Sequence, residues 1–257
     1  MIPLRWVRVV LTFLGVSLVL GAANAGLDAV LRFLAGVPPP EDQLQFLVCA
    51  FAITTFPWVA PRVMPLVARG QLPADAPQLT RLRIALGRLQ STGVVPLPRV
   101  YLLESSKFFA VALGHRRGSA IFFSSGLVDA LGDRDLQAVV AHELGHIQSN
   151  HQARTTLFVA ALFLAKAFFT LGLPFVVGAY LLYMALLRRH EFQADAYAAK
   201  LTSEPELRSM LLAVGRLAGV QPEAPTGKKE LSNPLLKLLS THPSYADRIG
   251  RSLARAS

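Results

Sequence analysis

The sequence is poor in cysteine and in charge. Its single cysteine, Cys49, excludes an intramolecular disulfide framework and argues against a structural zinc site, since such sites are usually closed by cysteine. Charged residues make up only 16% of the chain, below the roughly 25% that is usual for soluble domains, whereas hydrophobic residues make up 53%. There is no internal repeat and no nucleic-acid-binding motif. We therefore expect no nucleic-acid partner, and attribute the net charge of +10 to contact with anionic lipids.

Two long apolar runs occupy residues 7–25 and 44–60, and each is close to the length needed to span a bilayer. A turn-rich loop containing three consecutive prolines separates them. Two arginines, Arg5 and Arg8, lie at the start of the first run, and five more follow the second run before residue 90, as the positive-inside rule expects. The pattern predicts two transmembrane helices within residues 1–64, with residues 26–42 facing outward and the chain returning to the cytoplasmic side.

The first run also fits a second interpretation. Arg5 and Arg8 resemble the charged region of a signal peptide, residues 9–20 its apolar region, and residues 23–25 (ANA) a cleavage site. Under this interpretation residues 1–25 are removed, and the topology after residue 43 is unchanged.

Residues 142–146 read HELGH, a pattern typical of metallopeptidases. Residues four apart share one face of a helix, so His142 and His146 can bind one tetrahedral zinc ion. Glu143 lies one position round the helix, where a carboxylate can act as a general base on a water molecule. Asp133 is a suitable N-cap for this helix, and apolar residues recur through it at helical intervals.

A second motif, EFQAD at residues 191–195, provides the missing ligand. Glu191 and Asp195 are also four apart, so that Glu191 can complete a His₂Glu site. Asp195 can accept a hydrogen bond from the second ring nitrogen of His142 or His146. The alternative is that both motifs are ordinary solvated helix faces, because short motifs have false positives.

Three other histidines are weaker candidates for the third ligand. His151 lies five residues after His146, and position 152, where an extended motif needs histidine, is glutamine. We expect His190 to cap or pair at the start of a helix, and His115 to lie on the surface.

The apolar segment of residues 155–187 separates the two motifs. His146 and Glu191 must lie on the same side of the membrane to share one ion, so the segment must cross an even number of times or not at all. Residues 172–174 (GLP) predict a turn near its middle, with Pro174 at the start of a new helix. Each arm is slightly short for a 30 Å bilayer core. We predict a hairpin that dips into or barely crosses the membrane; a buried hairpin in a soluble protein is the alternative.

The remaining sequence predicts an α+β fold that is mostly helical. A helix is expected at residues 78–89, strands at 99–103 and 120–123, and a loop at 220–233. Ser203 and Glu206 form a predicted capping box at the start of a further helix. Residues 65–257 are therefore expected to form one catalytic unit that contains the hairpin.

The two motifs, together with THPS at residues 241–244 and Arg248, resemble the HtpX and CAAX prenyl protease group of integral-membrane zinc metallopeptidases (gluzincins). The resemblance covers roughly residues 98–248. It implies zinc bound by His142, His146 and Glu191, with Glu143 as the base. It further implies that His242 and Arg248 face the cleft, where they would stabilise an oxyanion or hold the substrate backbone.

One segment departs from the family pattern. Members often carry an edge segment of the type NAFAxG that binds the extended substrate, and here residues 109–114 read FAVALG. Phe109 replaces the asparagine, which puts substrate preference in doubt, although backbone pairing with a peptide does not depend on side-chain type. The segment is equally compatible with a buried strand.

The resemblance thus predicts a membrane-bound zinc endopeptidase that cleaves membrane or misfolded proteins, in the bacterial inner membrane with its active site on the cytoplasmic side. Its partners would be protein or peptide substrates and the lipid bilayer. The alternatives are a membrane signalling protein that uses a peptidase-like domain, and a non-catalytic membrane scaffold.

Overall fold

The computed structural model describes residues 41–68, 70–90, 96–168, 173–219 and 243–256. Several expectations fall outside these ranges: the first apolar run and its alternative as a signal peptide, the loop at residues 220–233, and His242. The chain divides into two compact units, which are described separately. One consists of Met1–Thr54 with Leu157–Phe175, and the other of Thr55–Thr156 with Val176–Ser257. The predicted division into residues 1–64 and 65–257 stays a prediction.

Helix α2 (Glu41–Val67) contains the second predicted span. Within it, Gln45–Val67 is long and apolar enough to cross a membrane, and no other helix in the described part of the chain meets that description. The helix continues through three prolines spaced four residues apart. In the unit that contains its first half, the rings of Phe46 and Phe163 lie 6.0 Å apart.

A three-stranded mixed sheet forms one layer of the larger unit, with strand order β1-β3-β2. The predicted strand at residues 99–103 is β1 (Arg99–Leu103), and β3 (Gly118–Ser124) extends the prediction for residues 120–123. These two strands are parallel, whereas β2 (Ala110–His115) and β3 are antiparallel. Among the described residues β2 pairs with β3 alone and is half-buried, so the segment expected at residues 109–114 is an edge strand rather than a buried one.

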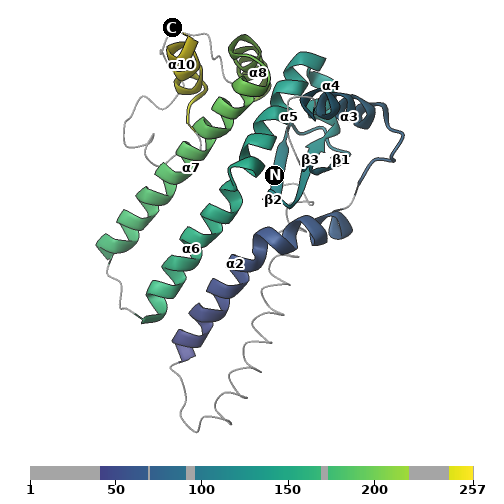
Figure 1. Ribbon diagram of the computed structural model, residues 1–257. Coiled ribbons are helices and arrows are strands. Elements are labelled where there is room, and N and C mark those ends of the chain that lie inside the picture. The colour runs from purple at the N-terminus through teal and green to yellow at the C-terminus, as the bar shows by residue number, and fades with distance from the viewer. Residues whose placement is uncertain (1–40, 69, 91–95, 169–172, 220–242, 257) are drawn as a thin grey trace. The chain divides into compact units, whose positions relative to one another are not determined.

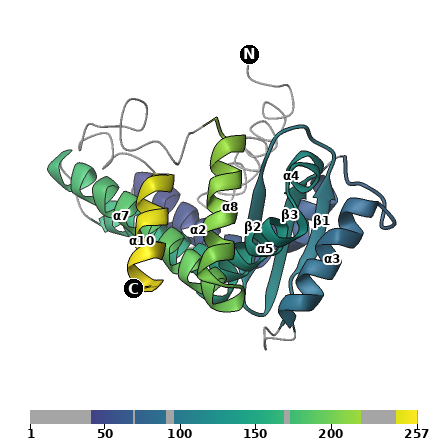
Figure 2. The same cartoon turned by 90° about the horizontal axis from the view of Figure 1, so that it is seen from above.

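Two helices pack on this sheet, side by side (Figures 1 and 2). Helix α5 (Asp133–Gln148) lies against β2, and α3 (Pro77–Gln90) lies against β1. The short helix α4 (Ser125–Ala130) follows β3, while α8 (Glu204–Leu217) packs on α5 and α10 (Tyr245–Ala256) packs on α8. Their apolar faces meet in one core that includes Leu82, Leu89, Phe123, Leu136, Leu144 and Leu211.

Two helix starts test the capping expectations. The predicted box at Ser203 is confirmed in its first half, since the Ser203 hydroxyl accepts a hydrogen bond of 3.3 Å from the backbone N–H of Glu206. The expectation for Asp133 is wrong by one residue. Gly132 is the N-cap of α5, and Asp133 lies in the first turn, where its negative charge still interacts favourably with the helix dipole.

Helices α6 (His151–Phe168) and α7 (Leu173–Leu201) contain the arms of the predicted hairpin. Helix α7 begins at Leu173, so Pro174 lies in its first turn, as the sequence predicts. The insertion of this hairpin into a membrane stays a prediction. Helix α7 extends well beyond residue 187 and includes the EFQAD motif. From Val176 onward it belongs to the larger unit.

Candidate metal centre

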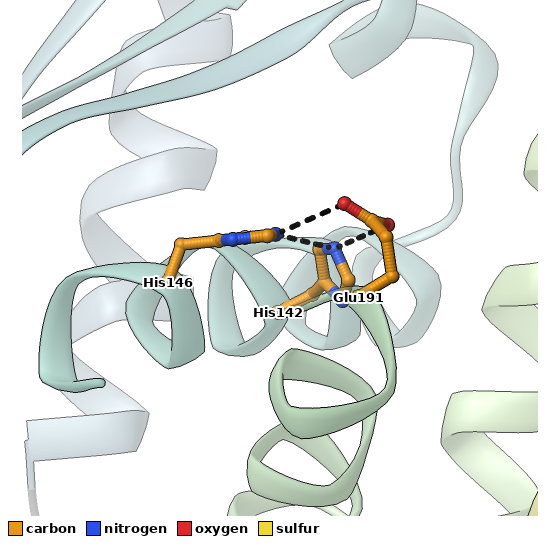
Figure 3. Close-up of side chains that lie close together, drawn as sticks. All are labelled: His142, His146 and Glu191. Carbon is orange, nitrogen blue, oxygen red and sulfur yellow. Dashed lines mark hydrogen bonds and ion pairs between the residues drawn. The ribbon is translucent and has the colours of Figure 1, made fainter. Parts of the chain in front are cut away.

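Side chains of His142 and His146 on α5 converge with that of Glu191 on α7 (Figure 3). One ligand atom from each residue lies within 4.8 Å of the other two. The Nε2 atoms of the two histidines are 3.1 Å apart, and the Glu191 carboxylate oxygens lie 3.7 Å from His142 Nε2 and 3.6 Å from His146 Nε2. The structure thus brings together the three residues that the sequence assigns to a metal.

A close crossing of α5 and α7 makes this convergence possible. A Cβ atom added to Gly145 would lie 2.8 Å from the Cα of Ala194, a distance that real Cβ atoms essentially never show. Gly145 lies between His142 and His146 in the sequence of α5, and Ala194 lies three residues after Glu191 in α7. The two small residues therefore allow the helix backbones to approach until a carboxylate from one helix meets two imidazoles from the other. The local sequence pattern does not predict this role for either residue.

His142 is held by a carboxylate–arginine pair. Its Nδ1 lies 3.0 Å from Asp195 Oδ1, so Nδ1–H donates to Asp195 and Nε2 keeps its lone pair facing the other ligands. Arg248 donates from Nε and Nη2 to the two oxygens of the same carboxylate, at 2.8 and 2.6 Å. Burial alone would raise the pKa of Asp195, but the hydrogen bonds from Arg248 and His142 lower it to about 2. The carboxylate is therefore ionised at neutral pH.

The same carboxylate acts on the basicity of His142. Burial by itself lowers the pKa of the imidazole, but the hydrogen bond to Asp195 and the negative charges of Asp195 and Glu191 together outweigh burial, so that the net pKa is raised. A more basic Nε2 is a stronger donor to a cation. Of the two histidines that the sequence offers as partners of Asp195, the structure places His142 within hydrogen-bond distance of it.

A second hydrogen-bonded chain supports His146. His151 Nε2 lies 3.0 Å from Gln193 Oε1, and His151 Nδ1 lies 2.9 Å from His146 Nδ1. Because an amide oxygen only accepts, His151 donates from Nε2, and its Nδ1 accepts from the Nδ1–H of His146. This network leaves Nε2 of His146 unprotonated. Burial, followed by the charge of His190, lowers the pKa of His151 to about 4, which keeps this ring neutral.

The turn between α5 and α6 brings His151 back to His146. Asn150 has a positive φ of 51°, a left-handed conformation that asparagine tolerates better than most residues. Helix α5 ends just before it and α6 begins just after it. His151 was considered in the sequence as an alternative third ligand, and the structure places it instead behind His146. Helical periodicity could not reveal this contact, because it crosses the break between two helices.

His190 completes this cluster, and the expectation for it is wrong. The residue lies deep within α7 rather than at a helix start, and is buried. Its ring stacks on His151, with centroids 4.1 Å apart and planes at 10°. His190 Nδ1 lies 3.3 Å from the Thr155 hydroxyl, whereas its Nε2 is a buried atom without a hydrogen-bond partner among the described residues. The third weaker candidate, His115, lies at the end of β2 rather than in a loop, half-buried 5.4 Å from the ring of Trp58.

Glu143 is buried beside the converging side chains. Burial raises the pKa of its carboxyl to about 7, although the charge of His142 and a hydrogen bond from the backbone of Ala112 on β2 oppose the shift. A carboxyl group with a pKa near neutrality is suited both to accept and to release a proton at physiological pH.

Arg248 lies close to the ligands, but its donors are already engaged. Besides its two bonds to Asp195, its Nη1 lies 3.5 Å from Glu191 Oε2, and its side chain is only 10% exposed. Burial lowers its pKa, but the hydrogen bond to Asp195 and the charges of Asp195 and Glu191 together raise it by more, so that the guanidinium stays charged. Arg248 therefore contacts the carboxylates of Asp195 and Glu191, and its donors are directed at these two side chains.

The donor set fits a metal ion of the kind expected. Each of the two imidazoles has its Nδ1 engaged in a hydrogen bond and presents Nε2 toward the Glu191 carboxylate, which completes a His₂Glu donor set of the kind found in catalytic zinc sites. The absence of cysteine and the presence of two hydrogen-bonded supports are also typical of catalytic rather than structural sites.

Comparison with known proteins agrees with this geometry. The family model described as "Peptidase family M48" matches residues 78–256. The chain belongs to peptidase family M48. This M48 peptidase is 29% identical over 232 residues to a "Protease HtpX homolog" of Acidiphilium cryptum, a match that covers 76% of this chain and 80% of the relative. A "Protease HtpX homolog" of Acaryochloris marina is 32% identical over 213 residues, with 68% and 72% covered.

A solved structure shares the fold of the M48 peptidase. Ste24p of S. mikatae superimposes with a TM-score of 0.65 at 20% sequence identity, over 95% of this chain and 65% of Ste24p. The predicted mostly helical fold with a small sheet is thus confirmed. Family and relatives also confirm the resemblance seen in the sequence, and identify a membrane-bound metallopeptidase that hydrolyses peptide bonds. They do not favour a signalling protein or a non-catalytic scaffold.

Proposed function

We propose that this M48 peptidase is a zinc-dependent endopeptidase of the bacterial inner membrane, which cleaves membrane or misfolded proteins from the cytoplasmic side. His142, His146 and Glu191 are the proposed zinc ligands. The observation that carries the proposal is the arrangement of the two Nε2 atoms and the Glu191 carboxylate, each histidine having its other ring nitrogen engaged in a hydrogen bond. The basic residues after the predicted second span support the cytoplasmic orientation.

Bound zinc would polarise the water and the scissile carbonyl. Glu143 takes a proton from the attacking water and then passes it to the leaving amine. Its buried position and a pKa near 7 suit both transfers. Asp195 and the His151–Gln193 pair hold the two imidazoles in the tautomer that leaves Nε2 free. Edge strand β2, next to α5, can pair with an extended substrate through its backbone.

We assign different roles to the two C-terminal residues. Because Arg248 forms a bidentate ion pair with Asp195, it is a positioning residue that fixes Asp195 and Glu191. We retain His242 as the residue that stabilises the oxyanion, on the basis of the family resemblance.

The test uses the full-length protein purified in a neutral detergent and a dye-labelled, unfolded protein as substrate. Cleavage should stop when a chelator removes the metal and return when zinc is restored. The Glu143→Gln protein should keep its zinc by elemental analysis, yet cleave about 10²–10⁴-fold more slowly. Glu104→Gln, which changes an exposed carboxylate directly after β1, is the matched control and should retain activity. Full turnover by Glu143→Gln would remove the assignment of the base.

A further inference from the structure

A hollow of about 250 Å³ lies where the end of α2 meets the sheet. Four arginines line it: Arg62 from α2, Arg99 from the start of β1, and Arg116 and Arg117 from the turn between β2 and β3. All four side chains are exposed, and all belong to the larger unit. The hollow has no carboxylate among its lining residues.

The partners of these arginines are neutral. The carbonyl of Pro61 cannot receive its usual helical hydrogen bond, because Pro65 has no N–H, and Arg99 donates to it instead at 3.0 Å. Arg62 donates to the carbonyl of Trp58, within the same helix. Each bond positions a guanidinium group without neutralising it.

The two arginines of the turn also have no balancing charge among the residues that the structure describes. Arg116 donates from Nε to the side-chain oxygen of Gln148 at 3.0 Å, and its backbone N–H donates to Asn150. Arg117 makes no side-chain hydrogen bond or ion pair within the described part of the chain. Burial, followed by the charges of Arg62 and Arg117, lowers the pKa of the neighbouring His115, which agrees with an electropositive surface. Four positive charges therefore surround one hollow.

An apolar stripe on α2 lies beside the hollow. Val59, Val63 and Leu66 follow one another at helical intervals, and their side chains are 48%, 43% and 84% exposed. Trp58, one helical turn before Arg62 and therefore on the same face of α2 as that arginine, is 46% exposed. Tryptophan next to arginine at the end of an apolar helix is typical of the boundary between lipid tails and headgroups. This stripe lies within Gln45–Val67, the candidate membrane span.

We propose that this arginine-lined hollow binds the phosphate headgroup of an anionic phospholipid, with the acyl chains against the apolar stripe of α2. Phosphate oxygens are favoured partners of guanidinium groups, which bind them through paired hydrogen bonds. The stripe distinguishes a lipid from a soluble phosphate, since only a lipid covers both surfaces. The net positive charge of the hollow selects an anionic headgroup over a zwitterionic one. Such binding would hold the catalytic sheet at the membrane surface.

The test measures the thermal unfolding of the full-length protein in neutral-detergent micelles that contain increasing amounts of phosphatidylglycerol. Phosphatidylglycerol should raise the unfolding temperature with saturation, whereas equal amounts of phosphatidylcholine, or millimolar inorganic phosphate, should have little effect. The double variant Arg62→Gln with Arg117→Gln keeps the bonds of Arg99 and Arg116. It should need at least tenfold more phosphatidylglycerol for half of the effect, since two basic residues near an anionic membrane contribute about 30-fold in affinity.

The matched control is the double variant Arg134→Gln with Arg208→Gln, which removes the same charge from exposed positions on α5 and α8. Its response to phosphatidylglycerol should stay within about threefold of the wild type. An equal loss in both double variants would overturn the proposed hollow. Saturable stabilisation by inorganic phosphate alone would overturn the lipid as its occupant. Neither outcome depends on the metal centre, so the peptidase proposal is tested separately.

Discussion

Gly145 of α5 packs directly against the backbone of Ala194 of α7 at the metal centre. No side chain fits between them, since a Cβ atom on Gly145 would lie 2.8 Å from the Cα and 3.0 Å from the carbonyl oxygen of Ala194. The obstacle is backbone, which cannot rotate away as a flexible side chain can. The distance between the two histidines and Glu191 is therefore fixed by the smallest residue in the HELGH motif.

The Gly145→Ala substitution should push the two helices apart. We expect a loss of about 1–3 kcal/mol in the free energy of unfolding, because of overpacking, and weaker zinc binding in competition with a chelator. Gly87→Ala is the matched control. Gly87 is exposed in α3 with no atom within 4 Å of an added Cβ, so that this change should stabilise the protein by about 0.5–1 kcal/mol. Unchanged zinc affinity in Gly145→Ala would show that the close crossing does not set the ligand geometry.

Removal of His151 should weaken metal binding without removing a ligand. His151→Ala deletes the acceptor of the His146 Nδ1–H, and we expect a 10–100-fold loss in zinc affinity, measured by chelator competition. His115→Ala, at the half-buried histidine beside Trp58, serves as the control and should leave zinc affinity unchanged. If His151→Ala only lowers stability and binds zinc as tightly as the wild type, the ring is a packing residue and not a support for His146.

Asp195 and Arg248 should behave as a coupled pair. Asp195→Asn removes the bidentate counter-charge of a buried guanidinium, which costs about 3–5 kcal/mol of stability, and also weakens the support of His142. The double variant Asp195→Asn with Arg248→Met should be less destabilised than the sum of the two single variants, as measured by chemical unfolding. Additive effects would mean that the ion pair contributes little to the site.

Removal of the metal should lower the unfolding temperature of the wild type but not that of the Glu191→Ala variant. Zinc at 100 times its dissociation constant stabilises a folded protein by about 2.7 kcal/mol, so a chelator should lower the unfolding temperature of the wild type by several degrees. The Glu191→Ala protein should contain little zinc by elemental analysis, and the chelator should leave its unfolding temperature unchanged. Full zinc occupancy in Glu191→Ala would point to a different third ligand.

The candidate ligand residues and most of the local structure could be predicted from the order of the amino acids. The four-residue spacing of His142 and His146 depends only on the helical repeat, and the strands at residues 99–103 and 120–123 follow from their β-branched and aromatic residues. The start of α7 next to Pro174 was likewise visible, because proline is favoured in a first helical turn.

The contacts by which neighbouring residues support the two motifs depend on how the helices pack together. The contact of His151 with His146 crosses a helix break at Asn150, and the bidentate pair of Arg248 with Asp195 joins positions 53 residues apart. Periodicity describes one helix at a time, whereas these contacts depend on how closely different helices approach. The packing of Gly145 against Ala194 sets the distance between α5 and α7. Because their backbones are in contact there, a side chain larger than hydrogen at position 145 would force the helices apart.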